Sequence, residues 1–259
     1  LPPDFLTSPP SQRTTLTPIH FPDTPLPGYA GCLAFTLDGV LSPDECAELV
    51  ALAESHSRAG PGQWERAMVN AGSHEIMATD IRNCGRIIWD DREVVARVWD
   101  RCLVALEREK EWLERVVVVD GEKKGTAKPS GDRVLEYLDK GYKWSFSRLN
   151  ERMRFLRYGK GEYFQAHQDG QYHTPDRSET SLLTLQLYLN DAETEVAAGR
   201  EPLVGGATTF HSWDLLRHHD VVPKVGRVLI FQHQMLVHSG AEVKKGMKIA
   251  MRTDLMYRK

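Results

Sequence analysis

The sequence predicts an α+β chain, mainly β, in which helices come first and a core of short strands follows. Two observations carry this prediction. Apolar residues recur at helical spacing from about residue 42 to about residue 116. From about residue 146 onward, short apolar runs are separated by turn signals, which is typical of a β-sandwich or a jelly-roll barrel. A chain of 259 residues can bury such a core in one catalytic unit.

The chain divides into three predicted parts. Residues 1–28 hold more than half of the fourteen prolines and few periodic apolar positions, which predicts an extended or disordered arm. Residues 29–145 are predicted to form the helical N-terminal part of the catalytic unit, and residues 146–259 its β-core. A β-type run over Gly31–Leu37 opens the second part.

Two helical segments are predicted in the N-terminal part. The first begins after Ser42, the expected N-cap, with Pro43 in the first helical position and Glu45 closing a capping box. The second covers about residues 92–116, where an apolar stripe lies opposite charged residues. The polar, glycine-containing residues 119–133 that follow predict a loop.

The later part of the chain contains the predicted strands, which are Met153–Tyr158, Leu182–Leu189, Ala207–Phe210, Arg227–Phe231 and Lys248–Tyr257. Alternation along the last strand puts Lys248, Ala250, Arg252 and Asp254 on one face. The apolar residues between them occupy the other face. This pattern fits a strand with its apolar face against helices and its polar face toward a cavity.

Composition argues against two classes of partner. The net charge is -3, so no broad basic field indicates nucleic acid. No apolar stretch approaches the ~18–20 residues of a membrane span, and no signal-peptide pattern is visible. The four cysteines form no C-x-x-C pair, which predicts buried free thiols in a reducing compartment, the cytoplasm or the nucleus; they are Cys32, Cys46, Cys84 and Cys102.

His167 and Asp169 stand one residue apart in an H-x-D motif, and His238 follows far along the chain. Two imidazoles and one carboxylate are the facial ligand set of mononuclear non-haem iron(II) oxygenases. If the motif lies on a strand, His167 and Asp169 project to one face and can reach an ion at about 2.1 Å. The distant histidine must then come from another strand. His233 is an alternative, but His238 is preferred because it follows the apolar residues 235–237.

The order of motifs around this pair resembles a known family. From about residue 150 to about residue 257 the chain is similar to the 2-oxoglutarate- and iron(II)-dependent oxygenases of the prolyl 4-hydroxylase-like group. The opening residues 37–42, before the first helix, also resemble that group. The matching positions, in order, are Tyr158, His167, Asp169, Gly205-Gly206-Ala207-Thr208, the run from Gly226 to Phe231, His238 and a basic residue beyond it.

The resemblance implies a double-stranded β-helix, or jelly roll, with the N-terminal helices packed on one sheet. It implies an enzyme in which iron(II) is bound by His167, Asp169 and His238 and in which 2-oxoglutarate and dioxygen are co-substrates, with ascorbate as a candidate reductant. The implied reaction hydroxylates an unactivated C–H bond and releases succinate and carbon dioxide. The carboxylate at Asp169 favours hydroxylation over halogenation, because loss of that carboxylate frees a position for halide in related enzymes.

The distal carboxylate of 2-oxoglutarate needs a buried cation, and two residues are candidates. Lys248 follows His238 at the spacing of the collagen-type prolyl hydroxylases. Arg252 lies four residues further along on the same face of the strand, and its guanidinium can bind a carboxylate through two hydrogen bonds. One of them is expected to bind 2-oxoglutarate and the other a polar substrate group, and the order stays open. By resemblance, the hydroxyl of Tyr158 contacts the co-substrate.

The substrate is predicted only as a class: a protein or peptide, or a small polar metabolite or amino acid. Arg82, Asn83 and His173 are candidate substrate contacts, and the oligomeric state is not predicted. Lys248 and Arg252 together favour a substrate with an anionic group. Two rival functions are a non-catalytic binding domain on the same core and a zinc hydrolase, although the H-E-x-x-H pattern of many zinc hydrolases is absent.

Overall fold

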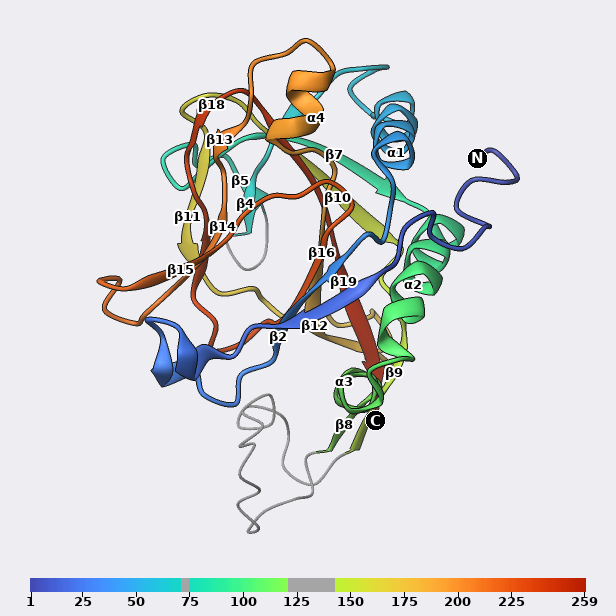
Figure 1. Ribbon diagram of the computed structural model, residues 1–259, viewed down its shortest axis with the longest axis vertical. Coiled ribbons are helices and arrows are strands. Elements are labelled where there is room, and N and C mark those ends of the chain that lie inside the picture. Colours follow the sequence, from blue (N-terminus) through green and yellow to red (C-terminus); the bar gives the residue numbers. More distant parts are fainter. Residues whose placement is uncertain (71–74, 121–142) are drawn as a thin grey trace.

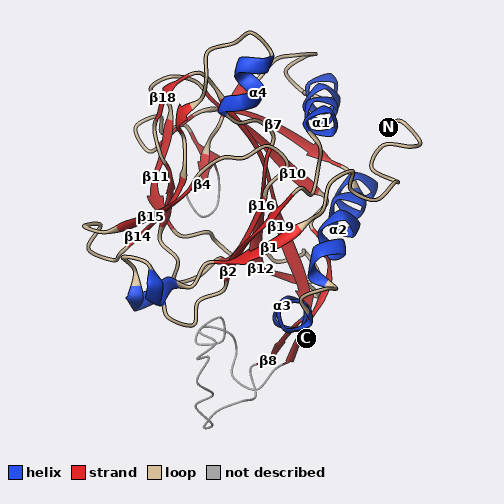
Figure 2. Cartoon of the chain, viewed as in Figure 1, coloured by secondary structure: helices blue, strands red, loops and turns tan. Residues whose placement is uncertain are grey.

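The computed structural model describes residues 1–70, 75–120 and 143–259, in which two antiparallel β-sheets pack against each other (Figure 1). Side chains from both sheets meet in one apolar cluster that contains Tyr188, Phe210 and Phe231. Helices cover the outer face of the larger sheet (Figure 2). This arrangement confirms the predicted mainly β fold, a jelly-roll core with N-terminal helices packed on one sheet.

The large sheet runs in the order β1 (Thr15–Pro18), β2 (Ala34–Asp38), β16 (Val228–Gln232), β12 (Thr180–Tyr188), β19 (Lys248–Arg258), β10 (Arg152–Tyr158), β7 (Gly85–Asp90) and β3 (Glu65–Arg66). In addition, β9 (Lys143–Leu149) pairs with β19, and β8 (Val118–Asp120) pairs with β9. The small sheet runs in the order β15 (His218–Val221), β14 (Thr208–His211), β17 (His238–Gly240), β11 (Tyr163–His167) and β6 (Arg82–Asn83). Two further pairs are β13 (Val204–Gly205) with β18 (Val243–Lys245), and β4 (Val69–Asn70) with β5 (Glu75–Ile76).

The predicted helices begin close to the residues at which the sequence signals placed their starts. Helix α1 (Pro43–Ser55) starts with the predicted capping box between Ser42 and Glu45. The second predicted segment is two helices, α2 (Arg92–Leu106) and α3 (Lys110–Val117), so its continuity was wrong. Because of the turn between them, Trp112 of α3 packs against Phe35 of β2, with 5.3 Å between the ring centroids. Helix α3 therefore lies against the sheet. The short helices are η1 (Phe21–Asp23), η2 (Pro27–Tyr29) and α4 (Ala192–Ala197).

The proline-rich residues 1–28 are packed on the body of the protein. Strand β1 pairs with β2 at the edge of the large sheet. Phe5 and Leu6 are buried in the helix-covered core, while Phe21 and Leu26 are buried between the two sheets. Of the two predicted alternatives, an extended or a disordered arm, the disordered arm was therefore wrong, because these few large apolar side chains bury enough surface to order an otherwise polar, proline-rich segment.

The predicted helical part, residues 29–145, also contributes strands that its sequence pattern did not reveal. Strand β7 pairs with β10 in the large sheet, and its Ile87 and Trp89 lie in the core. Of the predicted loop at 119–133, Val119 and Asp120 end β8, and the rest lies outside the described residues. All four cysteines are buried thiols. Among the described residues, no helix is long and apolar enough to cross a membrane.

Gly226 fixes the turn into β16. Its φ is +71°, and a Cβ there would lie 1.9 Å from the carbonyl oxygen of Leu41. Its N–H donates to the carbonyl of Tyr188 at 2.9 Å, and its carbonyl accepts from the N–H of Val40 at 3.0 Å. The glycine thus lets the start of α1 approach the end of β12 closely.

We expect Gly226→Ala to lower the free energy of unfolding by about 3 kcal/mol or more, because strain and a backbone clash act together. Gly199→Ala is the matched control: its φ is +69° and no heavy atom lies within 4 Å of the added Cβ. The control should lose only the left-handed strain, about 1–2 kcal/mol. Urea unfolding of both variants measures the difference, and equal losses would show that the close approach is unimportant.

Candidate metal centre

Two histidines face each other across a strand pair of the small sheet. His167 is the last residue of β11 and is the direct register partner of His238, the first residue of β17. Side chains directly opposite each other in an antiparallel pair have Cβ atoms about 4.5–5.5 Å apart. Pairing therefore brings the distant histidine to the motif, as the spacing argument required.

Asp169 lies just past the end of β11, so the expectation that it shares a strand with His167 was wrong. Its side chain turns into the interior, where the hydroxyl of Thr184 on β12 donates to Oδ2 at 2.6 Å. Arg252 on β19 approaches Oδ1 at 3.0 Å. Two strands of the large sheet thus hold the carboxylate in place. Its direction is not set by strand alternation along β11.

The three side chains form a ligand set for one metal ion. Their donor atoms all lie within 4.8 Å of one another, and each histidine Nε2 is 3.7 Å from an oxygen of Asp169. An ion at about 2.1 Å from each donor fits such separations. The Nδ1 atoms of His167 and His238 lie 2.8 Å and 3.1 Å from the carbonyls of Gln165 and Leu236, which leaves Nε2 free for the metal.

Electrostatics keep Asp169 and His238 in their metal-binding protonation states. Burial opposes the charge on Asp169, but Arg252 and His238 hold the pKa of its carboxyl well below the ordinary range. Burial lowers the pKa of His238 to about 3, with a further contribution from His167. An ionised carboxylate beside a neutral imidazole is the form that a divalent cation requires.

His233 lies apart from this centre. It is fully buried, with Nε2 at 3.5 Å from Asp254 and Nδ1 at 3.5 Å from Ser181. Asp254 in turn contacts Arg252 and Arg154. His233 therefore belongs to a polar network behind the metal centre, and the structure brings His238 to the third ligand position instead.

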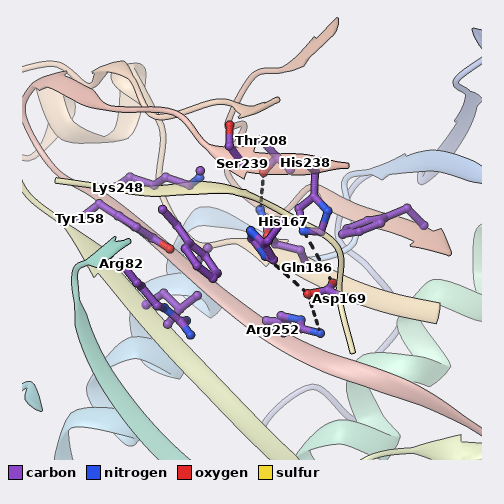
Figure 3. Close-up of a pocket in the computed structure, with 15 residues that line it drawn as sticks. Arg82, Tyr158, His167, Asp169, Gln186, Thr208, His238, Ser239, Lys248 and Arg252 are labelled. Atoms are coloured by element: carbon purple, nitrogen blue, oxygen red, sulfur yellow. Dashed lines mark hydrogen bonds and ion pairs between the residues drawn. The ribbon is translucent and has the colours of Figure 1, made fainter. Parts of the chain in front are cut away.

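The pocket around the centre lies between the two sheets, and strand β19 supplies two of its cations (Figure 3). Lys248 is 3% exposed and lies opposite Tyr158 of β10 in the sheet register. Its Nζ is 5.3 Å and 5.6 Å from the ring centroids of Tyr158 and Tyr188. In the described parts of the chain, no carboxylate pairs with it. Burial lowers the pKa of Lys248 to about 8.

Arg252 has a different environment from Lys248. Its guanidinium contacts Asp169 at 3.0 Å and Asp254 at 3.1 Å, so it is already paired with two carboxylates. Both residues nevertheless line the same pocket, as does Ala250 between them. The predicted polar face of this strand thus lines the pocket.

Of the predicted substrate contacts, the structure brings only Arg82 into the pocket lining. Asn83 is outside that lining and accepts a hydrogen bond from Arg66 at 2.9 Å. His173 is exposed in the segment between β11 and β12, where its backbone forms an isolated antiparallel β-bridge with Thr180.

Sequence reasoning missed several polar residues of the lining. Gln186 on β12 donates to the hydroxyl of Thr208 on β14 at 2.6 Å, and Tyr188 donates to the same oxygen at 2.7 Å. Ser239 also lines the pocket. The signal was present, because Thr184 and Gln186 are polar positions within an apolar strand that faces the cavity.

Comparisons with known proteins agree with this geometry. The family model of the 2OG-Fe(II) oxygenase superfamily matches residues 153–253, which include all three ligands and the two pocket cations Lys248 and Arg252. No curated protein matches the sequence significantly. A prolyl 4-hydroxylase from Pseudomonas putida is similar in structure, with 17% identity and a TM-score of 0.51, covering 90% of this chain and 96% of that one.

A second similar structure is a prolyl hydroxylase from Trichoplax adhaerens, in complex with a peptide fragment of the oxygen degradation domain of hypoxia inducible factor. It has 12% identity and a TM-score of 0.51, and the match covers 88% of this chain and 84% of that one. At such identities the two likenesses establish the common fold.

We expect His167→Ala to weaken binding of a divalent ion at this centre by at least about 100-fold, because it removes one of three protein ligands. His173→Ala is the matched control, since that histidine is exposed and lies outside the pocket lining. Calorimetric titration with Mn²⁺ or Co²⁺ under anaerobic conditions measures both. Equal metal affinity in the two variants would place the ion elsewhere.

Proposed function

We propose that this chain, whose residues 153–253 match the family model of the 2OG-Fe(II) oxygenase superfamily, hydroxylates a C–H bond of a polypeptide or a small polar substrate. The observation that carries the proposal is one pocket lined by two kinds of binding group. The first is the metal-ligand cluster of His167, Asp169 and His238. The second is the buried Lys248, which has no carboxylate partner among the described residues.

Each part of the pocket has a separate task in this reaction. When bound, iron(II) with 2-oxoglutarate and dioxygen supplies the oxidising power that turns C–H into C–OH, with succinate and carbon dioxide as the other products. His167, Asp169 and His238 would hold the ion. Thr184 and Arg252 fix the orientation of the Asp169 carboxylate.

We propose Lys248, and not Arg252, as the anchor for the distal carboxylate of 2-oxoglutarate. A buried cation without an anionic partner is unstable by several kcal/mol, and a bound carboxylate removes that penalty. Arg252 is already neutralised by Asp169 and Asp254. The hydroxyl of Tyr158 points toward the middle of the pocket (Figure 3), which supports a contact between it and the co-substrate.

A peptide is our preferred substrate form. Exposed apolar side chains of Ile76, Met77 and Ile81 precede Arg82 in the chain, and Ile81 hydrogen-bonds to β11 through its backbone. An extended chain can use such apolar side chains as contacts beside the pocket. The similar Trichoplax structure holds a peptide, which supports the same form of ligand.

The decisive experiment measures succinate formed from 2-oxoglutarate by the pure protein with iron(II) and ascorbate. We expect slow turnover without substrate, lost in His167→Ala and retained in His173→Ala. Absence of both turnover and 2-oxoglutarate binding in the metal-loaded protein would favour a non-catalytic domain. Ester or amide hydrolysis by the zinc-loaded protein would instead favour a hydrolase.

Binding of 2-oxoglutarate should depend on pH through Lys248. The lysine must be charged to pair with the carboxylate, and its pKa in the free protein is lowered to about 8 by burial. The dissociation constant should therefore be constant below pH 8 and rise toward tenfold per pH unit above it. Calorimetry with Mn²⁺-loaded protein from about pH 6 to about pH 10 measures this dependence.

Two variants separate charge from structure in that titration. Lys248→Arg should bind with no loss of affinity between pH 8 and about pH 10, because a guanidinium stays charged. Lys248→Ala should bind about 30-fold more weakly or worse at every pH, since a buried charge pair is broken. If Lys248→Ala bound normally while Arg252→Ala did not, the anchor would be Arg252.

A further inference from the structure

Arg82 stands beside the metal centre but is not used by the reaction described so far. It lies on β6, where it is the register partner of Phe164 on β11. Its guanidinium carbon is 4.6 Å from the centroid of the Phe164 ring. That ring stacks on the imidazole of His167, with 3.8 Å between the centroids. A single aromatic ring thus separates this cation from a metal ligand.

No carboxylate among the described residues pairs with Arg82. The side chain is buried, with the residue 8% exposed. Its hydrogen bond to the carbonyl of Met68 is long, at 3.4 Å, and its buried Nε finds no acceptor among the described residues. By contrast, the buried Arg86 and Arg101 pair with Glu75 and Glu45.

The nearby carboxylates are already occupied. Glu75 binds Arg86 through both of its oxygens, at 2.9 Å each. Asp254 is shared by Arg252 and Arg154, and Asp169 is a metal ligand as well as a partner of Arg252. The co-substrate also leaves Arg82 unmatched, because one of its carboxylates belongs to the metal and the other to Lys248.

Arg82 and Lys248 lie on different sides of the Tyr158 ring in the pocket (Figure 3). The buried Nε of Arg252, on the same side as Arg82 in this view, also has no acceptor in the described parts of the chain. A second anion can therefore occupy this side of the pocket while 2-oxoglutarate extends toward Lys248. Guanidinium groups with free N–H donors favour planar carboxylates.

We propose that Arg82 binds a carboxylate of the substrate, so that this protein acts on carboxylate-bearing molecules and holds their anionic group at a guanidinium one ring away from the metal ligand His167. This inference rests on the proposed function and names the substrate class for it. The carboxylate can belong to a free amino acid or to an acidic residue of a peptide, and both present the same chemistry to the guanidinium.

The test compares pairs of probes that differ only in charge. N-acetylproline and N-acetylprolinamide represent a free carboxylate, and acetyl-Pro-Glu-amide and acetyl-Pro-Gln-amide represent an acidic side chain. Their binding to the Mn²⁺-loaded, 2-oxoglutarate-saturated protein is followed by calorimetry. We expect at least one carboxylate probe to bind about tenfold more tightly than its neutral partner. The pair that shows the preference identifies the source of the anion.

Substitutions then assign the preference to Arg82. Arg82→Gln should reduce the charge preference to nearly one, while the affinities for Mn²⁺ and 2-oxoglutarate stay unchanged. Arg82→Met keeps the packing on Phe164 and serves as a second variant if the first does not fold. Arg66→Gln is the matched control, because Arg66 is a half-exposed arginine on neighbouring β3 that pairs with Glu162, and it should retain the preference.

Three outcomes would overturn the inference. One is a wild-type protein that binds 2-oxoglutarate but neither carboxylate probe, or binds them no better than the neutral ones. Another is a preference that survives in the Arg82 variants. The third is a loss of 2-oxoglutarate affinity in those variants, which would make Arg82 a co-substrate contact. If the wild type fails to bind 2-oxoglutarate at all, the proposed function itself is wrong, and this result is distinct from the other three.

Discussion

The centre of this protein depends on one strand register, the pairing of β11 with β17 that sets His167 opposite His238. A shift by one residue would turn one imidazole to the other face of the sheet. The carboxylate that completes the set is held by Thr184 and Arg252, which belong to the opposite sheet. The ligand set therefore exists only while the two sheets are packed together, so the apolar cluster between them is a precondition for metal binding.

Local patterns in the sequence predicted the parts of the fold that depend on interactions between residues close together in the chain. Ser42 and Glu45 make a capping box because both partners lie within one helical turn. Lys248 and Arg252 share a pocket because strand alternation is regular from Lys248 to Arg252 of β19. The sequence also predicted the mainly β fold and the closeness of the three ligands. The ligands could be predicted because only a few strand arrangements can bring a remote histidine to an H-x-D motif.

What the sequence could not predict is decided by partners far along the chain. Asp169 is aimed by Thr184 and Arg252, and no local pattern signals these contacts. Phe21 and Leu26 order a proline-rich segment because a cavity between the sheets accepts them. Arg82 could be named as a polar residue near the site, but its lack of a carboxylate partner appears only when the described neighbours are placed around it.

The contact between Arg252 and Asp169 has a consequence for how the protein is loaded. A divalent ion that binds here approaches a carboxylate whose charge is already shared with a guanidinium 3.0 Å away. The dianionic 2-oxoglutarate would add negative charge beside the ion, so each of the two ligands would favour binding of the other. Because such coupling is reciprocal, the protein would hold its metal more firmly when the co-substrate is bound.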